Sequence, residues 1–511
     1  MKKSELVFIP LPAIGHLKST VEFAKLLLDQ DERLSITVLV ILPIGDETNI
    51  TSYTQSLANS NTRITYTMIH PTHHLFQPSS SMCFEKLATI FIEKHKTQVE
   101  QAVMELLSDN STHVVGFVLD MFCCCMIDVA NKFKLPSYIF FISQVAFLGF
   151  LLHLPVRDSN GGRNFNLTDP DSDFSSFRNP VPANALPHAA LDKIGGGYES
   201  FHYLGTRFHE SKGIIVNSFA ELEPYAINSM VTQSTVYPVG PLLDLKVNDN
   251  KSTESIRILN WLDNQPSKSV VFLCFGSMGS FKPTQLEQIA MALESIDHRF
   301  LWSIRQPPSK DMHGAPRDCT SYEKVLPDGF FSRVKDRGMV CGWAPQIEVL
   351  AHEAINGFVS HCGWNSILES LWFGVPIATW PLYAEQQVNA FVMVRELRLG
   401  VELSLTYRSG SELVVADQIK RALNSLMDDS NPVRERVKKM SEESRKALMK
   451  GGSSLLTLEK LVEDIMDVFV VICHSILPSL WPIHQLDVKN EFLHWYLLET
   501  VHMHQPLARI L

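Results

Sequence analysis

Short apolar runs alternate with helical patterns through the first half of the chain. The stretches Ser19–Gln30 and Cys83–Leu107 carry apolar residues at the spacing of one helix face, which predicts helices. Strands that alternate with helices are typical of a parallel, doubly wound sheet. The strand-like runs are Leu6–Pro10, Ile36–Leu42, Val114–Leu119, Ser137–Phe141, Gly213–Asn217 and Tyr237–Leu242.

The same alternation resumes after a polar stretch, residues 244–255, whose composition is that of a linker. Helical patterns follow at Thr284–Ser295 and Ser366–Phe373. We therefore expect an α/β protein of two Rossmann-like, doubly wound domains that face a cleft, one over residues 1–243 and one over 256–468. The strand-like runs of the second domain are Ser269–Phe275, Phe300–Ile304, Gly338–Cys341, Gly357–His361 and Pro376–Pro381.

Length and composition agree with two domains and exclude several classes of protein. A chain of 511 residues exceeds what one hydrophobic core serves, and a hydrophobic content of 45% fits well-filled cores. The 45 basic and 55 acidic residues give a net charge of −10 without a basic stripe, so nucleic acid is a poor partner. Nine cysteines lack the paired spacings of a disulfide framework or a zinc site.

The chain also lacks the signals of a secreted or membrane protein. Pro10 and Pro12 interrupt the N-terminal apolar run, which is too short for a signal peptide. No apolar stretch reaches the ~18 residues that a membrane span needs. We expect a cytoplasmic monomer with reduced thiols.

The most informative chemistry lies around the turn that follows the run Gly357–His361. A turn and a helix N-terminus there offer free backbone N–H groups and the positive end of a helix dipole to an anion. A diphosphate is therefore expected beside His361, Asn365 and Ser366, with Gly363 allowing close approach.

The neighbouring side chains suit the rest of a nucleotide sugar. Trp343 offers a flat surface for a base, and Gln346 an amide for the ribose or the base edge. The Glu369 carboxylate can accept protons from two ribose hydroxyls. Glu385 and Gln386 follow an apolar strand at its carboxyl end, where parallel sheets bind ligands, and they suit sugar hydroxyls. Taken singly, each of these residues fits an ordinary buried core equally well.

In this order and spacing, the residues resemble the signature box of plant secondary-product glycosyltransferases, the UDP-dependent family 1 enzymes, and the likeness spans roughly residues 5–466. The resemblance implies the two-Rossmann GT-B fold, with the acceptor in the first domain and UDP-glucose, a co-substrate rather than a cofactor, in the second. Most members carry Asp where Glu385 stands, and Gln386 implies a preference for glucose. The donor-binding set that it implies comprises Gly276, Ser277, Trp343, Ala344, Gln346, His361, Gly363, Trp364, Asn365, Ser366, Glu369, Glu385 and Gln386.

The transfer needs a base, because an alcohol is a poor nucleophile until its proton is removed. His16 follows the first strand and a Pro-Ala-Ile-Gly turn, and an imidazole titrates near ~6.5, which suits a base at neutral pH. Asp120 closes the strand Val114–Leu119 and can orient that ring. Without the resemblance, an ordinary loop histidine and a helix-capping aspartate remain open alternatives. The resemblance assigns His16 and Asp120 to a catalytic dyad.

A histidine base acting directly on the acceptor implies one displacement with inversion, and hence a β-glucoside. The sequence has no metal-ligand spacing, and none is needed. Ser143 is placed near the donor or the acceptor by family analogy. The acceptor class that we expect is a small lipophilic alcohol, whether phenolic, flavonoid, lignan or terpenoid. Aromatic side chains that either line its pocket or belong to the core are Phe122, Phe140, Phe141, Phe147, Phe150 and Phe201.

The C-terminus departs from the family. The helical pattern Ser453–Val468 is similar to the family's last helix, which crosses back to the first domain, but residues 469–511 follow it. The run 481–494 resembles a fragment of a copia-type retrotransposon reverse transcriptase. Asp487 stands where that polymerase binds metal, but a second acidic motif is absent, which excludes polymerase activity. We hypothesise that the tail is an insertion or a read-through without chemistry of its own.

Three alternatives stay open on the sequence alone. The chain could use another UDP-sugar, it could be a decayed UDP-binding product without activity, or it could be a hydrolase or epimerase on a similar fold. Intact His16, Asp120 and Glu385 argue against the decayed product.

Overall fold

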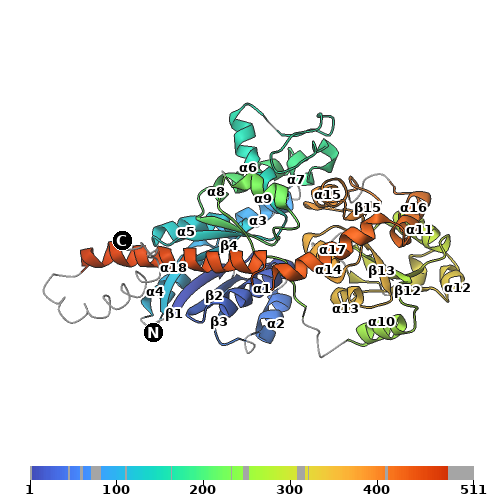
Figure 1. Ribbon diagram of the computed structural model, residues 1–511, viewed down its shortest axis with the longest axis horizontal. Helices are drawn as coiled ribbons and strands as arrows, with labels where there is room; N and C mark the ends of the chain where they lie inside the picture. The colour runs from blue at the N-terminus through green and yellow to red at the C-terminus, as the bar shows by residue number, and fades with distance from the viewer. Residues whose placement is uncertain are drawn as a thin grey trace, which may run out of the picture. The chain divides into compact units, whose positions relative to one another are not determined.

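The structure is a computed structural model that describes residues 3–43, 47–57, 61–70, 82–109, 112–162, 164–231, 233–245, 252–307, 317–319, 321–408 and 413–480. It contains two parallel sheets, and the expected α/β fold class is confirmed. The sheets lie on either side of residues 244–255 in the sequence, and we call the parts that contain them the N-terminal and C-terminal halves. In Figure 1 the N-terminal half runs from blue to green and the C-terminal half from yellow-green to red.

The N-terminal half is built on seven parallel strands in the order β3-β2-β1-β4-β5-β6-β7. Every residue of β2 and β5 is buried, as expected where helices cover both faces of a sheet. The strands are β1 (Lys3–Ile9), β2 (Leu34–Ile41), β3 (Ile64–Ile69), β4 (Thr112–Asp120), β5 (Ser137–Phe141), β6 (Gly213–Val216) and β7 (Val236–Pro238). The helices are α1 (Ile14–Gln30), α2 (Glu47–Leu57), α3 (Phe84–Glu93), α4 (Lys96–Ser108), η1 (Met121–Met126), α5 (Ile127–Lys132), α6 (Val145–Ser159), η2 (Ala183–Ala185), α7 (His188–Leu191), α8 (Gly197–Phe208) and α9 (Pro224–Met230).

The C-terminal half is built on six parallel strands in the order β12-β9-β8-β13-β14-β15. These strands are β8 (Val270–Cys274), β9 (Arg299–Ser303), β12 (Gly338–Cys341), β13 (Ile355–Ser360), β14 (Ile377–Thr379) and β15 (Gly400–Glu402), and β10 (Arg305–Gln306) pairs with β11 (Arg317–Asp318) in a separate ribbon. The helices are α10 (Thr253–Asp263), α11 (Pro283–Glu294), η3 (Tyr322–Lys324), α12 (Phe330–Val334), α13 (Gln346–Leu350), α14 (Trp364–Phe373), α15 (Gln386–Phe391), the π-helical turn η4 (Val392–Glu396), α16 (Ala416–Met427), α17 (Pro432–Ala447) and α18 (Ser453–Leu480).

Both sheets have one point at which the strand order reverses. It lies between β1 and β4 in the first sheet and between β8 and β13 in the second. Successive connections leave such a point in opposite directions, which opens a crevice outside the carboxyl ends of the two strands. Residues just after these four strands are therefore placed where ligands bind.

Four helices differ clearly from the sequence-based expectation. The pattern over Cys83–Leu107 forms two helices, α3 and α4, which part at His95, whose Nδ1 donates to the Phe91 carbonyl (2.8 Å). Helix α1 begins at Ile14, five residues before its expected start, so the predicted turn is partly its first turn. Helix α18 continues past the expected end at Val468 to Leu480.

The two halves contact each other at α15 and at the start of α18. Val388, Phe391 and Val392 of α15 and η4 belong to the hydrophobic core cluster of the N-terminal half. Ser453 Oγ donates to Glu221 (2.8 Å), and Ser454 Oγ donates to the Gly240 carbonyl. The first turn of α18 thus contacts the N-terminal half.

The chain divides into a compact unit over residues 1–462 and a second unit over 463–511. Residues 481–511 lie outside the described ranges, so the resemblance of the tail to a reverse transcriptase stays a prediction. Among the helices that the structure describes, none has the length and apolarity to cross a membrane. The cysteines with described side chains are free thiols, and all but Cys83 are buried.

Candidate active site

The predicted dyad forms at the reversal point of the first sheet. His16 lies in the first turn of α1, directly after β1, and Asp120 is the last residue of the adjacent strand β4. His16 Nδ1 donates to Asp120 Oδ2 (2.7 Å), and Asp120 Oδ1 accepts the Phe122 backbone N–H (3.0 Å). Because Nδ1 carries the proton, the lone pair of the neutral ring is on Nε2, the nitrogen that can act as a base.

The surroundings of His16 favour its protonated form. Burial lowers the pKa of the ring, but the nearby carboxylates of Asp120 and Glu385 outweigh this and raise the pKa above 6.5. Glu385 belongs to the C-terminal half, so the carboxylate expected to hold the sugar acts electrostatically on the expected base.

The expected diphosphate seat forms at the reversal point of the second sheet. His361 follows β13, and Gly276, with φ +72°, follows β8. A Cβ atom at Gly276 or Gly363 would lie 2.6 or 2.5 Å from His361 Nε2, so the ring leaves room for glycine alone. Burial lowers the pKa of His361 to about 4, which keeps the ring neutral at pH 7. Beside it, Ser277 is exposed, and α14 begins with backbone N–H groups that its own turns do not pair.

The nucleoside end of the site has an open aromatic surface. The Trp343 side chain is 54% exposed, and the Arg305 guanidinium lies 5.3 Å from its ring centroid. Ala344, the next residue, is buried. This arrangement leaves indole surface available for a base to stack on.

A hydrogen-bonded group stands where the ribose is expected. Gln346 Nε2 donates to Ser366 Oγ (2.8 Å) and to Glu369 Oε2 (2.6 Å). Burial raises the pKa of Glu369 to about 7, although the hydrogen bond from Gln346 opposes the shift. The carboxylate is therefore poised to titrate near neutral pH.

The expected sugar-binding residues lie at the start of α15. Glu385 Oε1 is 3.4 Å from Ser143 Oγ, which reaches it from the loop after β5, and 3.3 Å from Asn389 Nδ2. Gln386 Oε1 accepts the backbone N–H groups of Leu382 (2.9 Å) and Tyr383 (3.1 Å), which fixes its side chain. Ser143 is thus brought to the donor-binding residues across the two halves.

Trp364 and Asn365 make contacts that the sequence did not indicate. The Trp364 indole is 3% exposed, and its Nε1 donates to the Asn217 carbonyl of the N-terminal half (2.6 Å). Asn365 Nδ2 donates to Ser19 Oγ (3.2 Å). The ring N–H of Trp364 is therefore engaged between the halves, and the sugar contact that the family resemblance implies for Trp364 stays a prediction.

The aromatic residues near the base divide into core and surface. Phe122 lies with its ring centroid 6.0 Å from that of His16, and it makes an edge contact with Phe84, which is 58% exposed. Phe84 therefore provides exposed apolar surface next to Phe122, which is itself buried (7% exposed) between Phe84 and the base. The core alternative holds for the others, which are buried within the N-terminal half: Phe140, Phe141, Phe147, Phe150 and Phe201.

Comparisons with known proteins bear on this geometry. A family model described as UDP-glucoronosyl and UDP-glucosyl transferase matches residues 243–446. The UDP-glucose flavonoid 3-O-glucosyltransferase 6 of Fragaria ananassa is 47% identical over 483 residues, which cover 91% of this chain and 99% of that protein. The chain belongs to this family of UDP-glycosyltransferases. UDP-glycosyltransferase 71K1 of Malus domestica is 44% identical, over 91% of this chain and 99% of its own length.

Solved structures of other UDP-glycosyltransferases share the fold. UGT71G1 of Medicago truncatula, complexed with UDP-glucose, aligns with a TM-score of 0.80 at 43% identity, over 91% of this chain and 98% of that one. A transferase from Siraitia grosvenorii in complex with UDP aligns with a TM-score of 0.82 at 42% identity, over 91% and 100%. The two parallel-sheet domains of this UDP-glycosyltransferase thus form the GT-B architecture that the sequence predicted.

The site of this UDP-glycosyltransferase also contains residues that the sequence analysis did not single out. They are Gln144, Asn217, Arg305 and Asn389. Asn389 follows Glu385 by four residues, a spacing that places both on one face of a helix and could have revealed it. The others come from distant strands and loops, so no local pattern indicated them.

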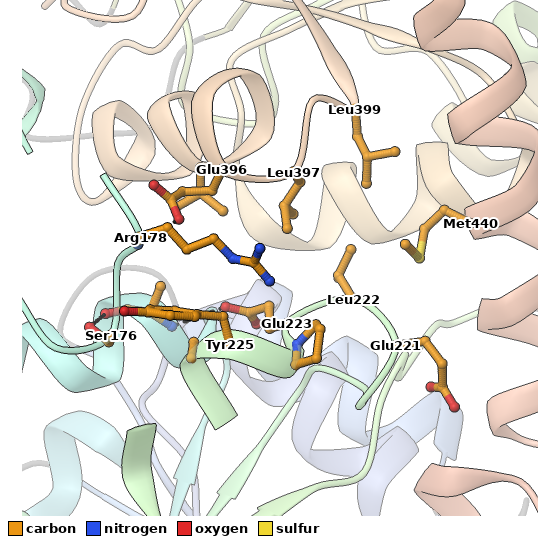
Figure 2. Close-up of a pocket in the computed structure, with 14 residues that line it drawn as sticks. Ser176, Arg178, Glu221, Leu222, Glu223, Tyr225, Glu396, Leu397, Leu399 and Met440 are labelled. Atoms are coloured by element: carbon orange, nitrogen blue, oxygen red, sulfur yellow. Dashed lines mark hydrogen bonds between the residues drawn. The ribbon is translucent and has the colours of Figure 1, made fainter. Parts of the chain in front are cut away.

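A separate pocket of about 240 Å³ lies between α9 and η4 (Figure 2). Arg178 extends over the Tyr225 ring, with 5.1 Å from its guanidinium to the ring centroid, and Glu396 accepts the Arg178 backbone N–H (2.8 Å). No residue of the predicted site lines it. Three carboxylates and one guanidinium line it, a balance that disfavours an anionic ligand.

Proposed function

We propose that the protein transfers glucose from UDP-glucose to a hydroxyl of a small lipophilic acceptor, with inversion to a β-glucoside. The observation that carries the proposal is the His16–Asp120 pair, which stands at a strand-order reversal within electrostatic range of Glu385. Nε2 of His16 takes the proton from the hydroxyl of the acceptor. At the same time the hydroxyl oxygen bonds to the anomeric carbon of glucose, and the bond from that carbon to UDP breaks. Asp120 holds the ring and stabilises the imidazolium that forms.

The donor groups have a division of roles in this proposal. The Trp343 ring stacks on uracil, and Glu369 accepts the ribose hydroxyls. The leaving diphosphate receives N–H donors from the start of α14 and from His361, together with the hydroxyls of Ser277 and Ser366. Glu385 and Gln386 hold the glucose hydroxyls.

The exposed ring of Phe84 and the neighbouring Phe122 favour a flat, apolar acceptor beside the base. The relative from Fragaria ananassa is named for a flavonoid acceptor, which supports a phenolic substrate. A panel of phenolic and terpenoid acceptors with UDP-glucose, UDP-galactose and UDP-xylose, read by mass shift, identifies both substrates. The absence of any glucosylated product across the panel would overturn the proposal.

The His16→Ala variant tests the base. We expect kcat to fall by about 10²–10⁴-fold, the usual contribution of a general base. The dissociation constant of UDP, measured by calorimetry, should stay within about twofold, because the donor residues lie in the other half. Turnover at the wild-type rate would exclude His16 as the base, and release of free glucose without acceptor would reveal hydrolysis instead.

A further inference from the structure

Asn389, on α15, lies where three parts of the site meet. Its Nδ2 donates to the Cys362 carbonyl (2.9 Å) and lies 3.3 Å from Glu385 Oε1. Its Oδ1 accepts from Gln144 Nε2 of the N-terminal half (2.7 Å). The side chains of Asn389 and Gln144 are both fully buried. One buried amide thus joins the diphosphate turn, the sugar carboxylate and the opposite half.

The first of these contacts fixes the turn between His361 and Gly363. Cys362 has a φ of +63°, which is unfavourable for a residue with a side chain and therefore needs support from its surroundings. Its N–H donates to Ser360 Oγ (3.1 Å), and its carbonyl is the group that Asn389 pairs. The amide of Asn389 therefore stabilises the conformation that places His361 beside the two glycines.

The second contact orients the Glu385 carboxylate. Asn389 Nδ2 and Ser143 Oγ both approach the same oxygen, Oε1. Within the described residues, no hydrogen bond reaches the other oxygen, Oε2. Two donors on one oxygen turn the second toward a ligand, so a sugar hydroxyl finds an acceptor whose direction is already set.

The third contact crosses between the halves. Gln144 precedes α6 and follows Ser143, so one short loop approaches both Asn389 and Glu385. The flanking residues Val388 and Phe391 pack into the core cluster of the N-terminal half. Helix α15 is therefore held on the side of the base, although it belongs to the C-terminal half in sequence.

We propose that Asn389, held by Gln144, is a positioning residue that sets the Glu385 carboxylate, and through it the glucose, relative to His16. The proposal rests on the function proposed above and deepens it. Transfer needs the anomeric carbon within about 3–3.5 Å of the attacking oxygen, and an error of ~1 Å can lower the rate by about 10²-fold. The base and the sugar carboxylate belong to different halves, so the distance between the attacking oxygen and the anomeric carbon depends on how the halves are held. The buried amides of Asn389 and Gln144 hold them.

Asn389→Asp is the first test, because it keeps the shape and the acceptor oxygen but replaces the donor amide with a carboxylate oxygen that repels Glu385. We expect kcat/KM with UDP-glucose to fall by about 10²-fold, with a lower kcat and weaker discrimination against UDP-galactose. The dissociation constant of UDP should also rise, because the Cys362 carbonyl loses its donor, but by less than that of UDP-glucose, because UDP has no sugar for Glu385 to hold. Calorimetry with UDP and UDP-glucose, without acceptor, separates the two ligands.

Gln144→Leu tests the contact between the halves. It leaves both donor contacts of Asn389 in place, so we expect UDP-glucose binding near the wild-type value and a kcat lowered by about tenfold. The matched control is Gln387→Leu. Gln387 is also fully buried on α15, its Nε2 donates to the Tyr407 carbonyl of its own half (2.8 Å), and its Oε1, like that of Gln144, has no partner among the described residues. The control should lose similar thermal stability and keep its kcat.

Two results would overturn the inference. One is an Asn389→Asp variant that weakens UDP and UDP-glucose binding equally, because its role would then concern the diphosphate turn alone. The other is a Gln144→Leu variant with the kcat of the Gln387→Leu control. Failure of the proposed function has a different signature, namely a wild-type enzyme that transfers no glucose to any acceptor.

Discussion

Three side chains of the site have displaced pKa values, one because of neighbouring carboxylates and two because of burial. The carboxylates beside His16 raise its pKa despite burial, whereas burial alone lowers that of His361 to about 4. Burial raises the pKa of Glu369 to about 7. The proposed base, the proposed diphosphate ligand and the proposed ribose ligand therefore respond differently to pH.

The pH dependence of turnover should report His16. The base must be neutral to accept a proton. Because its pKa is raised above 6.5, His16 becomes neutral only at a higher pH than a free imidazole does. At saturating UDP-glucose, where protonation of Glu369 does not limit donor binding, we expect kcat/KM for the acceptor to rise with pH through that raised pKa and then level off. Steady-state rates between pH 5 and 9 measure this limb.

The Asp120→Asn variant is the companion measurement. Removing the carboxylate removes the main cause that raises the pKa, so the rising limb should move to lower pH. The plateau should fall by about 10²–10⁴-fold, because the ring loses its orientation and its charge stabilisation. An unmoved limb would mean that another group limits the rate.

Binding of the donor should depend on Glu369. A carboxylate accepts two ribose hydroxyls, and protonation removes part of that capacity. Below pH 7 we expect the dissociation constant of UDP-glucose to rise by up to about tenfold per pH unit, which calorimetry without acceptor can follow. In a Glu369→Gln variant the dissociation constant of UDP-glucose should no longer change with pH. If it still changes with pH in that variant, a different group titrates.

At the scale of the element, the turn between β13 and α14 depends on glycine for room rather than for backbone freedom. Gly363 has φ −62° and ψ 138°, angles that any residue adopts, yet a Cβ atom there would lie 2.5 Å from His361 Nε2. The constraint is therefore the neighbouring imidazole, which the sequence motif does not reveal.

Gly363→Ala should displace His361 and weaken UDP-glucose binding by roughly tenfold, since overpacking costs about 1–3 kcal/mol. Calorimetry of the folded variant measures this. Gly400→Ala is the control, because a Cβ atom there would meet its nearest neighbours at ordinary distances of 3.4–3.5 Å. Equal affinities in the two variants would refute the steric explanation.

Element types were more predictable from the sequence than element ends. β5 and β12 have the ends that the apolar runs indicated, because a strand buried on both faces is marked by composition alone. The start of α1 was wrong by five residues, because the Pro-Ala-Ile-Gly segment also suits a turn. The division at His95 was missed because it depends on one side chain bonding to a carbonyl.

At the scale of the molecule, two reversal points carry the chemistry. His16 and Asp120 follow the strands at the first, and Gly276 and His361 follow those at the second. The same topological rule therefore places the proposed base in one half and the proposed anion site in the other.

Removing the residues after Asp467 tests whether the tail contributes. Every residue of the dyad and of the donor-binding set lies in the compact unit over residues 1–462. We expect the truncated enzyme to glucosylate at the wild-type rate or faster, and to aggregate no more than the full chain in light scattering. A loss of glucosylation would contradict the hypothesis that the tail lacks a role.

The sequence by itself determined the two-domain α/β class and the family, and it nominated the donor-binding set, because strand composition and the signature box are local and nearly contiguous. The tertiary structure decided which distant groups meet; of the pairs that follow, the sequence had nominated only His16 with Asp120, and that through the family resemblance. His16 and Asp120 are 104 residues apart, Ser143 and Glu385 242, and Gln144 and Asn389 245. Such pairs depend on strand order and on how the halves pack, and these follow from the burial of whole faces rather than from any short pattern.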